Sequence, residues 1–473
     1  MTAKASCIPE VLEVADIVRR AGGRALLVGG SVRDRLMGLE PKDFDLECFG
    51  IDAGTLISAI GERFDLDLVG ASFGVVKIKS LPIDVSLARR ETKLGLGHRA
   101  FRMEHDKGIT LAEAASRRDF TINAIYEDVL GGEILDPWGG REDLAKRRLR
   151  HVSDHFCEDP LRVLRAMQFV ARFILSPDEA TVAVCRSMDC ENLAPERMLE
   201  EWNKLILKGR KISSGLEFLR ASGWLRFYPE LESTVGCLQE REWHPEGDVW
   251  EHTKLCVDRF AENRCGDDAE DRIVGYAVLC HDFGKSVTTA YDPGKGRICS
   301  IGHDEAGVAP TESFLRRLTN EERFVKAVSK LVRLHMRPYS LWRGNGSDNA
   351  VRRLSAEAGG VERLIRVSAC DVTLREPSPD DGAHLDWLSE RAEALRVKDA
   401  APKPFLQGRD LIAMGLKPSP EFGEILAKAY EAQLDGRFRD LAGAKDFARS
   451  LSGEGVAGRP QDFKEDGKSC SRQ

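Results

Sequence analysis

The segments LVGGSVRD, residues 27–34, and PKDFDL, residues 41–46, decide the fold of the first part of the chain. They predict an apolar strand that ends at two glycines, a helix that begins at Ser31, and a second strand that carries two carboxylates. Successive side chains of a strand alternate between its faces, so Asp43 and Asp45 should point the same way, with the neighbouring apolar residues in the core. Two carboxylates that face one point predict a site for a divalent cation.

The glycines and the helix start predict a phosphate site next to these carboxylates. Gly29 and Gly30 let backbone N–H groups approach a phosphate closely, and a helix N-terminus at Ser31 favours negative charge. Mg²⁺ commonly keeps one or two protein carboxylates and takes its other oxygens from water and phosphate. A glycine pair before a helix, or two carboxylates on a strand, is common by itself. At this spacing the two motifs together indicate nucleotidyl transfer from a nucleoside triphosphate, with Mg²⁺ held by Asp43 and Asp45.

GGSVRDRLMG, residues 29–38, followed by DFDL, residues 43–46, resembles the head of the polymerase-β-like nucleotidyltransferases. The resemblance is to the class II branch, which holds the bacterial CCA-adding tRNA nucleotidyltransferases and the poly(A) polymerases. It implies that CMP, CMP and AMP from CTP and ATP are added to the 3′ end of tRNA, without a nucleic acid template, by a two-metal mechanism. Arg33 would then steady the triphosphate. A poly(A) polymerase, or a partial enzyme that adds only CC or only A, is the alternative.

Two further features complete the expected head. Asp84 lies between two β-branched residues of a strand-like run, so its side chain leaves the core face. It is the candidate for a third catalytic carboxylate, and a solvated strand residue is the alternative. The polar segment 86–101, continuing to Ala115, is the expected place for a mobile lid. In the resembled family, a flexible loop in this position helps the switch from C to A addition, which favours addition of the full CCA sequence.

RRDFTINA, residues 117–124, matches a motif of that family completely. An arginine offers paired planar donors to phosphate oxygens, and Asp or Asn can accept from a sugar hydroxyl. The residues predicted to contact the triphosphate or the ribose are therefore Arg117, Arg118, Asp119 and Asn123.

EDPLR, residues 158–162, resembles the motif that selects the base in the same family. A carboxylate accepts from an exocyclic amino group, and a guanidinium donates to a ring nitrogen. Cytosine and adenine share that order of donor and acceptor, whereas uracil and guanine reverse it, so Asp159 and Arg162 would select CTP and ATP. From the residues alone, an i, i+3 surface ion pair is the simpler interpretation. Arg165, in the basic helix that follows, joins the nucleotide-binding set, and residues 195–200 resemble a motif that braces this helix.

Histidines and aspartates gather between residues 236 and 400. The pair HD after an apolar helix places charge at a buried helix end, where it needs a metal or a partner. The series resembles the HD-domain metal-dependent phosphohydrolases, and WHPEGDVWEHT, residues 243–253, resembles tRNA nucleotidyltransferases that carry such a domain. The resemblance implies a phosphatase or 2′,3′-cyclic phosphodiesterase with a transition metal such as Ni²⁺ or Mn²⁺. The implied metal ligands are His252, His281, Asp282, His303, His335 and Asp371.

Length and composition set the remaining expectations. A chain of 473 residues is expected to hold about three domains. The formal net charge of −7 argues against indiscriminate binding of nucleic acid, so tRNA would meet a local basic face. Twelve cysteines without a C-x-x-C pair are typical of thiols in a reducing compartment. With no leader pattern and no long apolar run, we expect a cytoplasmic protein without membrane contact, and the oligomeric state is left open.

The expected fold class is α+β, with an N-terminal mixed β-sheet head that has helices on one side, followed by all-α neck, HD and C-terminal regions. The expected boundaries are 1–135 for the nucleotidyltransferase head, 136–235 for the helical neck that binds the nucleotide base and RNA, 236–400 for the HD domain, 401–451 for the helical C-terminal region and 452–473 for a disordered tail. A hydrolase or a noncatalytic RNA binder is the alternative from another class, and the intact pair Asp43 and Asp45 argues against a dead transferase.

Overall fold

The computed structural model describes residues 8–68, 75–88, 90–93, 101–104, 108–376 and 381–451. The chain divides into two compact units, Met1–Arg333 with Cys370–Arg375, and Leu334–Ala369 with Glu376–Gln473. The segment expected to form a lid lies partly outside the described residues, and the expected tail lies wholly outside them.

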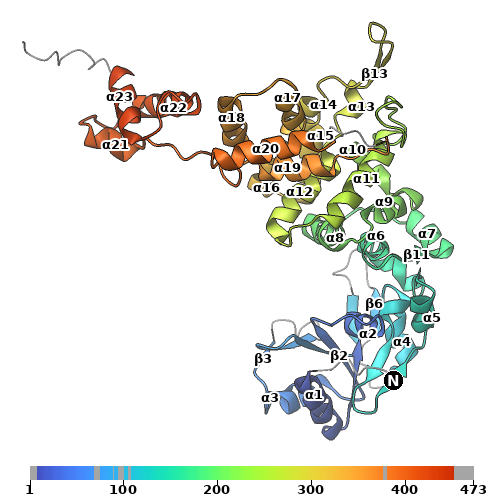
Figure 1. Cartoon of the computed structure of the whole chain (residues 1–473). Helices are drawn as coiled ribbons and strands as arrows, with labels where there is room; N and C mark the ends of the chain where they lie inside the picture. The colour runs from blue at the N-terminus through green and yellow to red at the C-terminus, as the bar shows by residue number, and fades with distance from the viewer. Residues whose placement is uncertain are drawn as a thin grey trace, which may run out of the picture. The chain divides into compact units, whose positions relative to one another are not determined.

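A seven-stranded mixed sheet forms the centre of the head, as expected from the sequence (Figure 1). Its strand order is β3-β4-β5-β2-β1-β8-β9. Strands β2 and β5 run parallel, and the other neighbours run antiparallel. The bounds are β1 Arg24–Val28, β2 Phe44–Phe49, β3 Leu66–Asp67, β4 Val75–Ile78, β5 Ile83–Leu87, β8 Tyr126–Asp128 and β9 Glu133–Leu135.

Helices cover the two faces of the sheet unequally. Helices α1 (Pro9–Arg20) and α3 (Ala53–Gly61) pack on one face, where Leu27, Leu46 and Val85 from three adjacent strands are fully buried. On the other face, α4 (Leu111–Ser116) packs only over β1 and β8 through a smaller apolar cluster. The larger core therefore has the expected arrangement, with helices on one side of the sheet. Helix α4 was not expected and lies on the other side.

The rest of the first unit is mainly helical. Helix α2 follows β1 directly, and the later helices continue to the end of the unit. The bounds are α2 Gly30–Leu36, α5 Gly140–Ala145, α6 Leu161–Phe173, α7 Glu179–Arg186, α8 Pro195–Lys208, α9 Ile212–Ala221, α10 Pro229–Glu232, α11 Val249–Glu262, α12 Asp268–Cys280, α13 Lys285–Thr288, α14 His303–Ala306, α15 Val308–Leu318 and α16 Glu322–Leu334.

Short strand pairs and 3₁₀ turns interrupt these helices. The pairs are β6 Arg90–Lys93 with β7 Phe101–Glu104, β10 Arg148–Leu149 with β11 Ser176–Pro177, and β12 Ala290–Asp292 with β13 Arg297–Cys299. The α+β fold class is confirmed, with the last two pairs added to regions that were expected to be all α.

Close helix packing places α6, which carries the predicted base-selecting residues at its start. A Cβ atom on Gly215 in α9 would lie 2.7 Å from the carbonyl oxygen of Met167 in α6, so glycine allows this approach. Trp202 in α8 packs edge-on against Tyr228 and against Phe314 in α15, with ring centroids 5.1 and 5.2 Å apart. The same aromatic core therefore joins the neck helices to the helices that follow them.

The second unit is helical in the part of the chain that the structure describes. The segment 408–437 lies in the expected helical C-terminal region and forms α21 and α22. The bounds are α17 Arg337–Arg343, α18 Asp348–Ala358, α19 Glu362–Cys370, α20 Ala383–Ala394, α21 Gly408–Ala413, α22 Glu421–Leu434 and α23 Leu441–Leu451.

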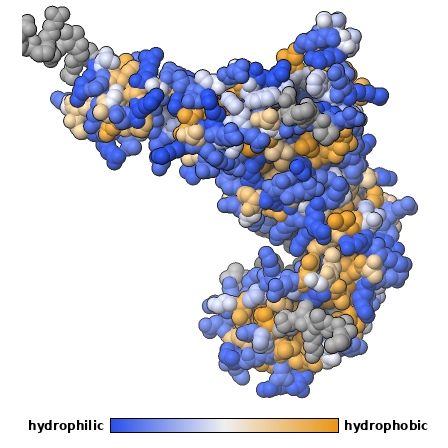
Figure 2. Space-filling view, viewed as in Figure 1, coloured by the Kyte–Doolittle hydropathy of each residue, from blue (hydrophilic) through white to orange (hydrophobic). Residues whose placement is uncertain are grey.

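The surface is mostly hydrophilic on the face drawn in Figure 2, and hydrophobic residues show mainly over the sheet and the helices that follow it. Among the described residues, none of the helices combines the length and the apolar character that are needed to span a bilayer.

Candidate active sites

Three carboxylates lie together where β2 and β5 run side by side. Asp43 lies directly before β2, although we expected it within the strand. Asp45 is the second residue of β2. Both are exposed, and the residues between and after them are buried, which confirms the predicted alternation. The strand register places Asp45 beside Asp84, whose carboxylate pairs with Lys77 Nζ at 2.9 Å. The three carboxylates are named the acidic triad below.

The acidic triad carries an excess of negative charge at Asp45. Although the Asp45 side chain is in contact with solvent, the surrounding protein removes part of its hydration and raises its pKa; the charges of Asp84 and Asp43 raise the pKa further, and Arg118 only partly opposes them. A group that is costly to ionise because other carboxylates face it is stabilised when a cation is added. The triad therefore fits a divalent cation, with Asp45 at its centre.

The glycine turn lies against the acidic triad. Gly29 caps α2 with a φ of 78°, and a Cβ there would lie 3.5 Å from both Asp45 Oδ2 and Arg118 Nη1. Gly30 begins the helix, and a Cβ there would lie 3.5 Å from Arg33 Nη2. The Ser31 hydroxyl donates to the carbonyl of Val28 at 3.1 Å. The predicted phosphate turn and the predicted cation ligands thus meet in space.

A chain of buried hydrogen bonds links α2 to α6. Arg33 donates through Nη1 to Asn123 Oδ1 at 2.7 Å, and Asn123 donates to Asp119 Oδ1 at 2.9 Å. Asp119 Oδ2 accepts from Arg165 at 2.7 Å. The guanidinium of Arg33 also lies 4.5 Å from the ring centroid of Phe173. Four residues predicted to contact the nucleotide therefore contact one another and are named the buried relay below.

The two adjacent arginines take different partners. Arg118 pairs with Glu47 at 2.9 Å, and the same carboxylate accepts from the Tyr126 hydroxyl at 2.8 Å. Arg117 pairs with Glu158 at 2.8 Å. Glu47 was missed from the sequence, although it follows Asp45 by two residues and therefore lies on the same strand face. It fixes a positive charge next to the glycine turn.

The residues predicted to select the base lie beside this arginine pair. Asp159 pairs with Arg197 Nη2 at 2.7 Å, and Arg162 donates to the backbone carbonyls of His155 and Arg117 at 2.6 Å each. Asp159 and Arg162 therefore each contact other groups in the structure. The sequence alone had favoured an i, i+3 ion pair between them. The carbonyl of Arg117 joins the base-selecting segment to the arginine pair that borders the acidic triad.

The brace motif also extends one residue further than the sequence interpretation placed it. Glu201, which completes the spacing E-R-x-x-x-E, is buried, pairs with Lys204 at 2.7 Å and lies 3.8 Å from Arg165. Arg197 and Glu201, one turn apart on α8, therefore contact Asp159 and Arg165 respectively.

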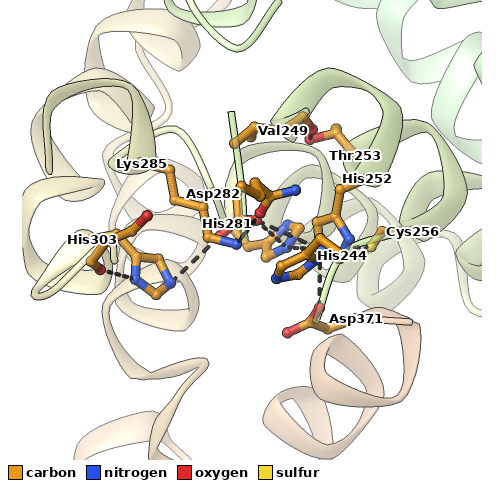
Figure 3. Close-up of polar contacts among 12 residues, drawn as sticks. His244, Val249, His252, Thr253, Cys256, His281, Asp282, Lys285, His303 and Asp371 are labelled. Atoms are coloured by element: carbon orange, nitrogen blue, oxygen red, sulfur yellow. Dashed lines mark hydrogen bonds and ion pairs between the residues drawn. The ribbon is translucent and has the colours of Figure 1, made fainter. Parts of the chain in front are cut away.

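A second cluster lies between α11, the end of α12 and the segment that contains Asp371 (Figure 3). The Nε2 atoms of His252 and His281 lie 3.3 Å apart. Asp371 Oδ1 lies 3.1 Å from His252 Nε2, and Asp282 Oδ2 lies 3.5 and 3.4 Å from the two rings. These four residues are named the histidine–aspartate cluster.

The spacing in the histidine–aspartate cluster fits a bound metal ion. Nitrogen and oxygen donors that lie about 2.0–2.2 Å from one cation are roughly 3 to 3.5 Å from one another. The other ring nitrogens already face acceptors, since His281 Nδ1 donates to the carbonyl of Val278 at 2.8 Å and His252 Nδ1 lies 3.0 Å from Glu246 Oε1. Each ring thus directs Nε2 into the cluster, as metal-binding histidines do.

The charge around the histidine–aspartate cluster also favours a cation. Burial lowers the pKa of His281, but Asp282 outweighs it and raises that pKa to about 9. Glu246, which the sequence interpretation missed, holds both His252 and His244, and its pKa lies well below its usual range despite burial because both rings contact it. The sequence signal that could have revealed Glu246 is its position six residues before His252, a predicted metal ligand.

Two further predicted ligands have different positions. His303 Nε2 lies 3.5 Å from Asp282 Oδ1, and its Nδ1 donates to the carbonyl of Ser300 at 2.8 Å. His335 is buried directly after α16 and belongs to the second unit, so its part in this site stays a prediction. Lys285, which was not predicted, pairs with Asp282 at 2.7 Å.

Comparison with known proteins finds relatives that match most of the chain. Residues 25–150 match the family described as Poly A polymerase head domain. The Multifunctional CCA protein of Xanthomonas campestris pv. campestris strain B100 is 35% identical over 417 residues, which cover 85% of this chain and 96% of that protein. The Multifunctional CCA protein of Stenotrophomonas maltophilia strain K279a is 34% identical over 412 residues, which cover 85% of this chain and 97% of that protein.

Solved structures share the fold along most of the chain. The crystal structure of the Bacillus stearothermophilus CCA-adding enzyme in complex with CTP has a TM-score of 0.62 and 22% identity, and it covers 94% of this chain and 98% of its own. The Thermotoga maritima CCA-adding enzyme complexed with tRNA has a TM-score of 0.56 and 19% identity, and it covers 94% of this chain and 96% of its own.

The buried relay generates a stability prediction. Burial opposes ionisation of Asp119, but Arg165 and Asn123 outweigh it and hold the pKa of Asp119 below its usual range. The ionised carboxylate therefore stabilises the folded state above about pH 4, and this contribution is lost as the pH falls through the folded-state pKa. Asp119→Asn is expected to lower the free energy of unfolding by about 2 to 3 kcal/mol at neutral pH, less than for a fully buried pair because Arg165 is partly exposed.

Chemical denaturation followed by circular dichroism at several pH values measures this effect. The gap between wild type and Asp119→Asn should be widest at neutral pH and should close in strong acid. Asp16→Asn, which removes a partly exposed carboxylate paired with the exposed Arg19 and Arg20, is the control and should change stability little. Equal losses in the two variants would contradict the assigned role of the relay.

Proposed function

Because the chain belongs to the family of the bacterial multifunctional CCA proteins, the CCA-adding tRNA nucleotidyltransferases, we propose that the two sites described above carry out the reactions of this family. The protein adds CCA to the 3′ end of tRNA and uses a divalent metal ion. The observation that carries this conclusion is 35% identity over 417 residues to a Multifunctional CCA protein. That match spans 85% of the chain, well beyond the head, and this favours CCA addition over a poly(A) polymerase.

The substrates are proposed to be tRNA, CTP and ATP, with all three nucleotides added by one active site. Solved structures of similar fold are complexes of CCA-adding enzymes with tRNA, with CTP and with ATP. The 3′ hydroxyl of tRNA attacks the α-phosphorus of the bound nucleotide, a new P–O bond forms there, and the bond to the β-phosphate breaks to release pyrophosphate.

We assign the transfer chemistry to the acidic triad and the glycine turn. Asp43 and Asp45 would hold Mg²⁺, and Asp84 would share a cation or orient the attacking hydroxyl. A cation there supplies Lewis-acid polarisation of the phosphoryl oxygens and of the attacking hydroxyl. Gly29 leaves room for a phosphate beside Asp45, and Arg118, fixed by Glu47, offers it a positive charge.

Arg33, Asp119, Asn123 and Arg165 take a different part in this proposal. Their side chains are engaged in the buried relay, which fixes the segment 117–124 between α2 and α6. They position the arginine pair and the start of α6, and contact with the triphosphate or the ribose would add to that role.

Base selection is assigned to Asp159 and Arg162. The Asp159 carboxylate would accept from the amino group of cytosine or adenine, and Arg162 would donate to the adjacent ring nitrogen. Arg197 donates to both carboxylate oxygens of Asp159, at 2.7 and 3.4 Å, and two backbone carbonyls hold Arg162. The pair is thus fixed before a nucleotide arrives, so uracil and guanine meet groups that cannot turn to suit them.

The histidine–aspartate cluster is proposed to be a phosphohydrolase site. Its histidine and aspartate donors suit a divalent transition metal, with Ni²⁺ and Mn²⁺ as candidates, and a bound metal would supply an activated water for attack on phosphorus. A phosphatase or 2′,3′-cyclic phosphodiesterase there would trim damaged 3′ ends before nucleotides are added.

The acidic triad generates the test of the transfer reaction. Wild-type protein given tRNA without its 3′ CCA should incorporate labelled CMP and then AMP. Asp45→Asn should lower incorporation by roughly 10³-fold, since the Lewis-acid contribution of a bound metal is several kcal/mol. Because ionised Asp45 is disfavoured in the folded protein, Asp45→Asn should also raise the melting temperature measured without metal.

Binding of tRNA, measured by gel shift, should survive in Asp45→Asn. Loss of tRNA binding together with a lower melting temperature would show misfolding and would remove support for the assigned role. Incorporation of AMP alone into long tails by the wild type would favour a poly(A) polymerase instead.

The base-selecting pair generates a specificity prediction. Asp159→Asn introduces an amide that can donate to O4 of uracil, so the ratio of kcat/KM for CTP over UTP should fall by roughly 10- to 100-fold. The matched control is Asp154→Asn, an exposed carboxylate in the same segment, which should leave the ratio unchanged. An unchanged ratio in Asp159→Asn would show that another group selects the base.

The histidine–aspartate cluster generates the last prediction here. Asp371→Asn should abolish metal-dependent hydrolysis of 2′,3′-cyclic AMP and leave CCA addition intact, while Asp45→Asn should do the reverse. Asp371 suits this test because its side chain is one-third exposed, so that its replacement perturbs folding little. Absence of hydrolysis by the wild type with both Ni²⁺ and Mn²⁺ would overturn the phosphohydrolase assignment.

A further inference from the structure

A thiol lies inside the histidine–aspartate cluster. Cys256 follows His252 by one turn of α11, so both side chains lie on the same helix face. Its Sγ lies 3.5 Å from His252 Nε2, and Cys256 is fully buried. The potential ligand atoms of Cys256, His252, His281 and Asp371 all lie within 4.8 Å of one another. Figure 3 shows the sulfur beside the His252 ring that also contacts Asp371.

The position of the sulfur fits direct coordination. A sulfur about 2.3 Å and a nitrogen about 2.0–2.1 Å from one tetrahedral cation are roughly 3.5 Å apart. The observed separation between Cys256 Sγ and His252 Nε2 has this value. No change of helix geometry is therefore needed for both atoms to reach one ion.

Metal binding would also remove the contact that the thiol now has. The sulfur of Cys256 and the carboxylate oxygen Oδ1 of Asp371 lie 3.5 and 3.1 Å from His252 Nε2. A metal ion on Nε2 occupies the single lone pair of that nitrogen, so Nε2 can then neither donate to the sulfur nor accept from it. The sulfur also lies 4.0 Å from the carbonyl oxygen of Val372, which is a weak acceptor at that distance. A buried thiol next to a cation is then better placed as a ligand than as a donor.

We propose that Cys256 is a thiolate ligand of the metal ion in the histidine–aspartate cluster, together with His252, His281 and Asp371. This inference rests on the proposed function of the cluster as a divalent metal site. On binding, the sulfur gives its proton to solvent and forms a bond to the cation, so one proton is released for each ion bound at this ligand.

The thiolate changes which metal ions the site prefers. Thiolate is a soft ligand that favours Zn²⁺, Co²⁺ and Fe²⁺ over Mn²⁺ and Mg²⁺, which prefer oxygen. With Cys256 in the donor set, the site is expected to select a thiophilic ion, and Mn²⁺ becomes the poorer of the two candidates named from the sequence.

Cobalt spectroscopy tests the proposal on the full-length protein. Metal-free protein titrated with one equivalent of Co²⁺ should show visible d–d bands from coordination by the cluster and a near-ultraviolet band from sulfur-to-cobalt charge transfer. Cys256→Ser, which is nearly isosteric and so guards against misfolding, should lose the charge-transfer band. It should also weaken Zn²⁺ binding in chelator competition by at least the roughly 10- to 100-fold that loss of an outer partner causes. Cys265→Ser, at an exposed cysteine of the same unit, is the matched control and should keep the band.

The outcomes separate this inference from the proposed metal site. Loss of the charge-transfer band in Cys256→Ser but not in Cys265→Ser supports the thiolate ligand. Visible bands without a charge-transfer band in the wild type overturn the thiolate ligand and leave the metal site standing. Absence of both kinds of band, with no Zn²⁺ bound, overturns the metal site and the inference together.

Discussion

The buried relay from Arg33 through Asn123 and Asp119 to Arg165 is the interaction on which the transfer site depends. It joins the helix that follows the glycine turn to the helix that begins at the base-selecting segment. A buried polar chain of this kind is stable only when every member has its partner, so it holds the two elements in one arrangement. We propose that the acidic triad at one end and Asp159 with Arg162 at the other face the two ends of one nucleotide.

Both candidate sites collect negative charge or electron pairs before a cation is present. In the triad, strand register puts Asp45 beside Asp84, and the raised pKa of Asp45 records the cost. In the histidine–aspartate cluster, two ring nitrogens and two carboxylates meet at about 3 to 3.5 Å. Each site therefore gains stability from a cation that it binds, and each has outer partners that keep its ligands oriented.

The sequence motifs did not reveal the residues that hold the predicted site residues in place. Glu47, Glu201, Glu246 and Lys285 were missed, although each contacts a residue that was predicted. Such residues have no chemistry of their own that marks them in a sequence, because a glutamate beside an arginine is usually a surface ion pair. Their role follows from burial and from the partner that the fold brings to them. Cys256 was missed for the same reason, since a cysteine between apolar residues looks like an ordinary core residue.

The sequence by itself determined the strand–glycine–helix turn, the alternation that exposes Asp43 and Asp45, and the α+β class. These features depend on local periodicity and on turn chemistry, which neighbouring residues decide. The tertiary structure alone decided that Asp159 pairs with Arg197, that Arg33 is held within the relay, and that a thiol lies among the histidines. Those contacts join residues that are distant in the chain, and only the packing of helices and strands sets the distances between them.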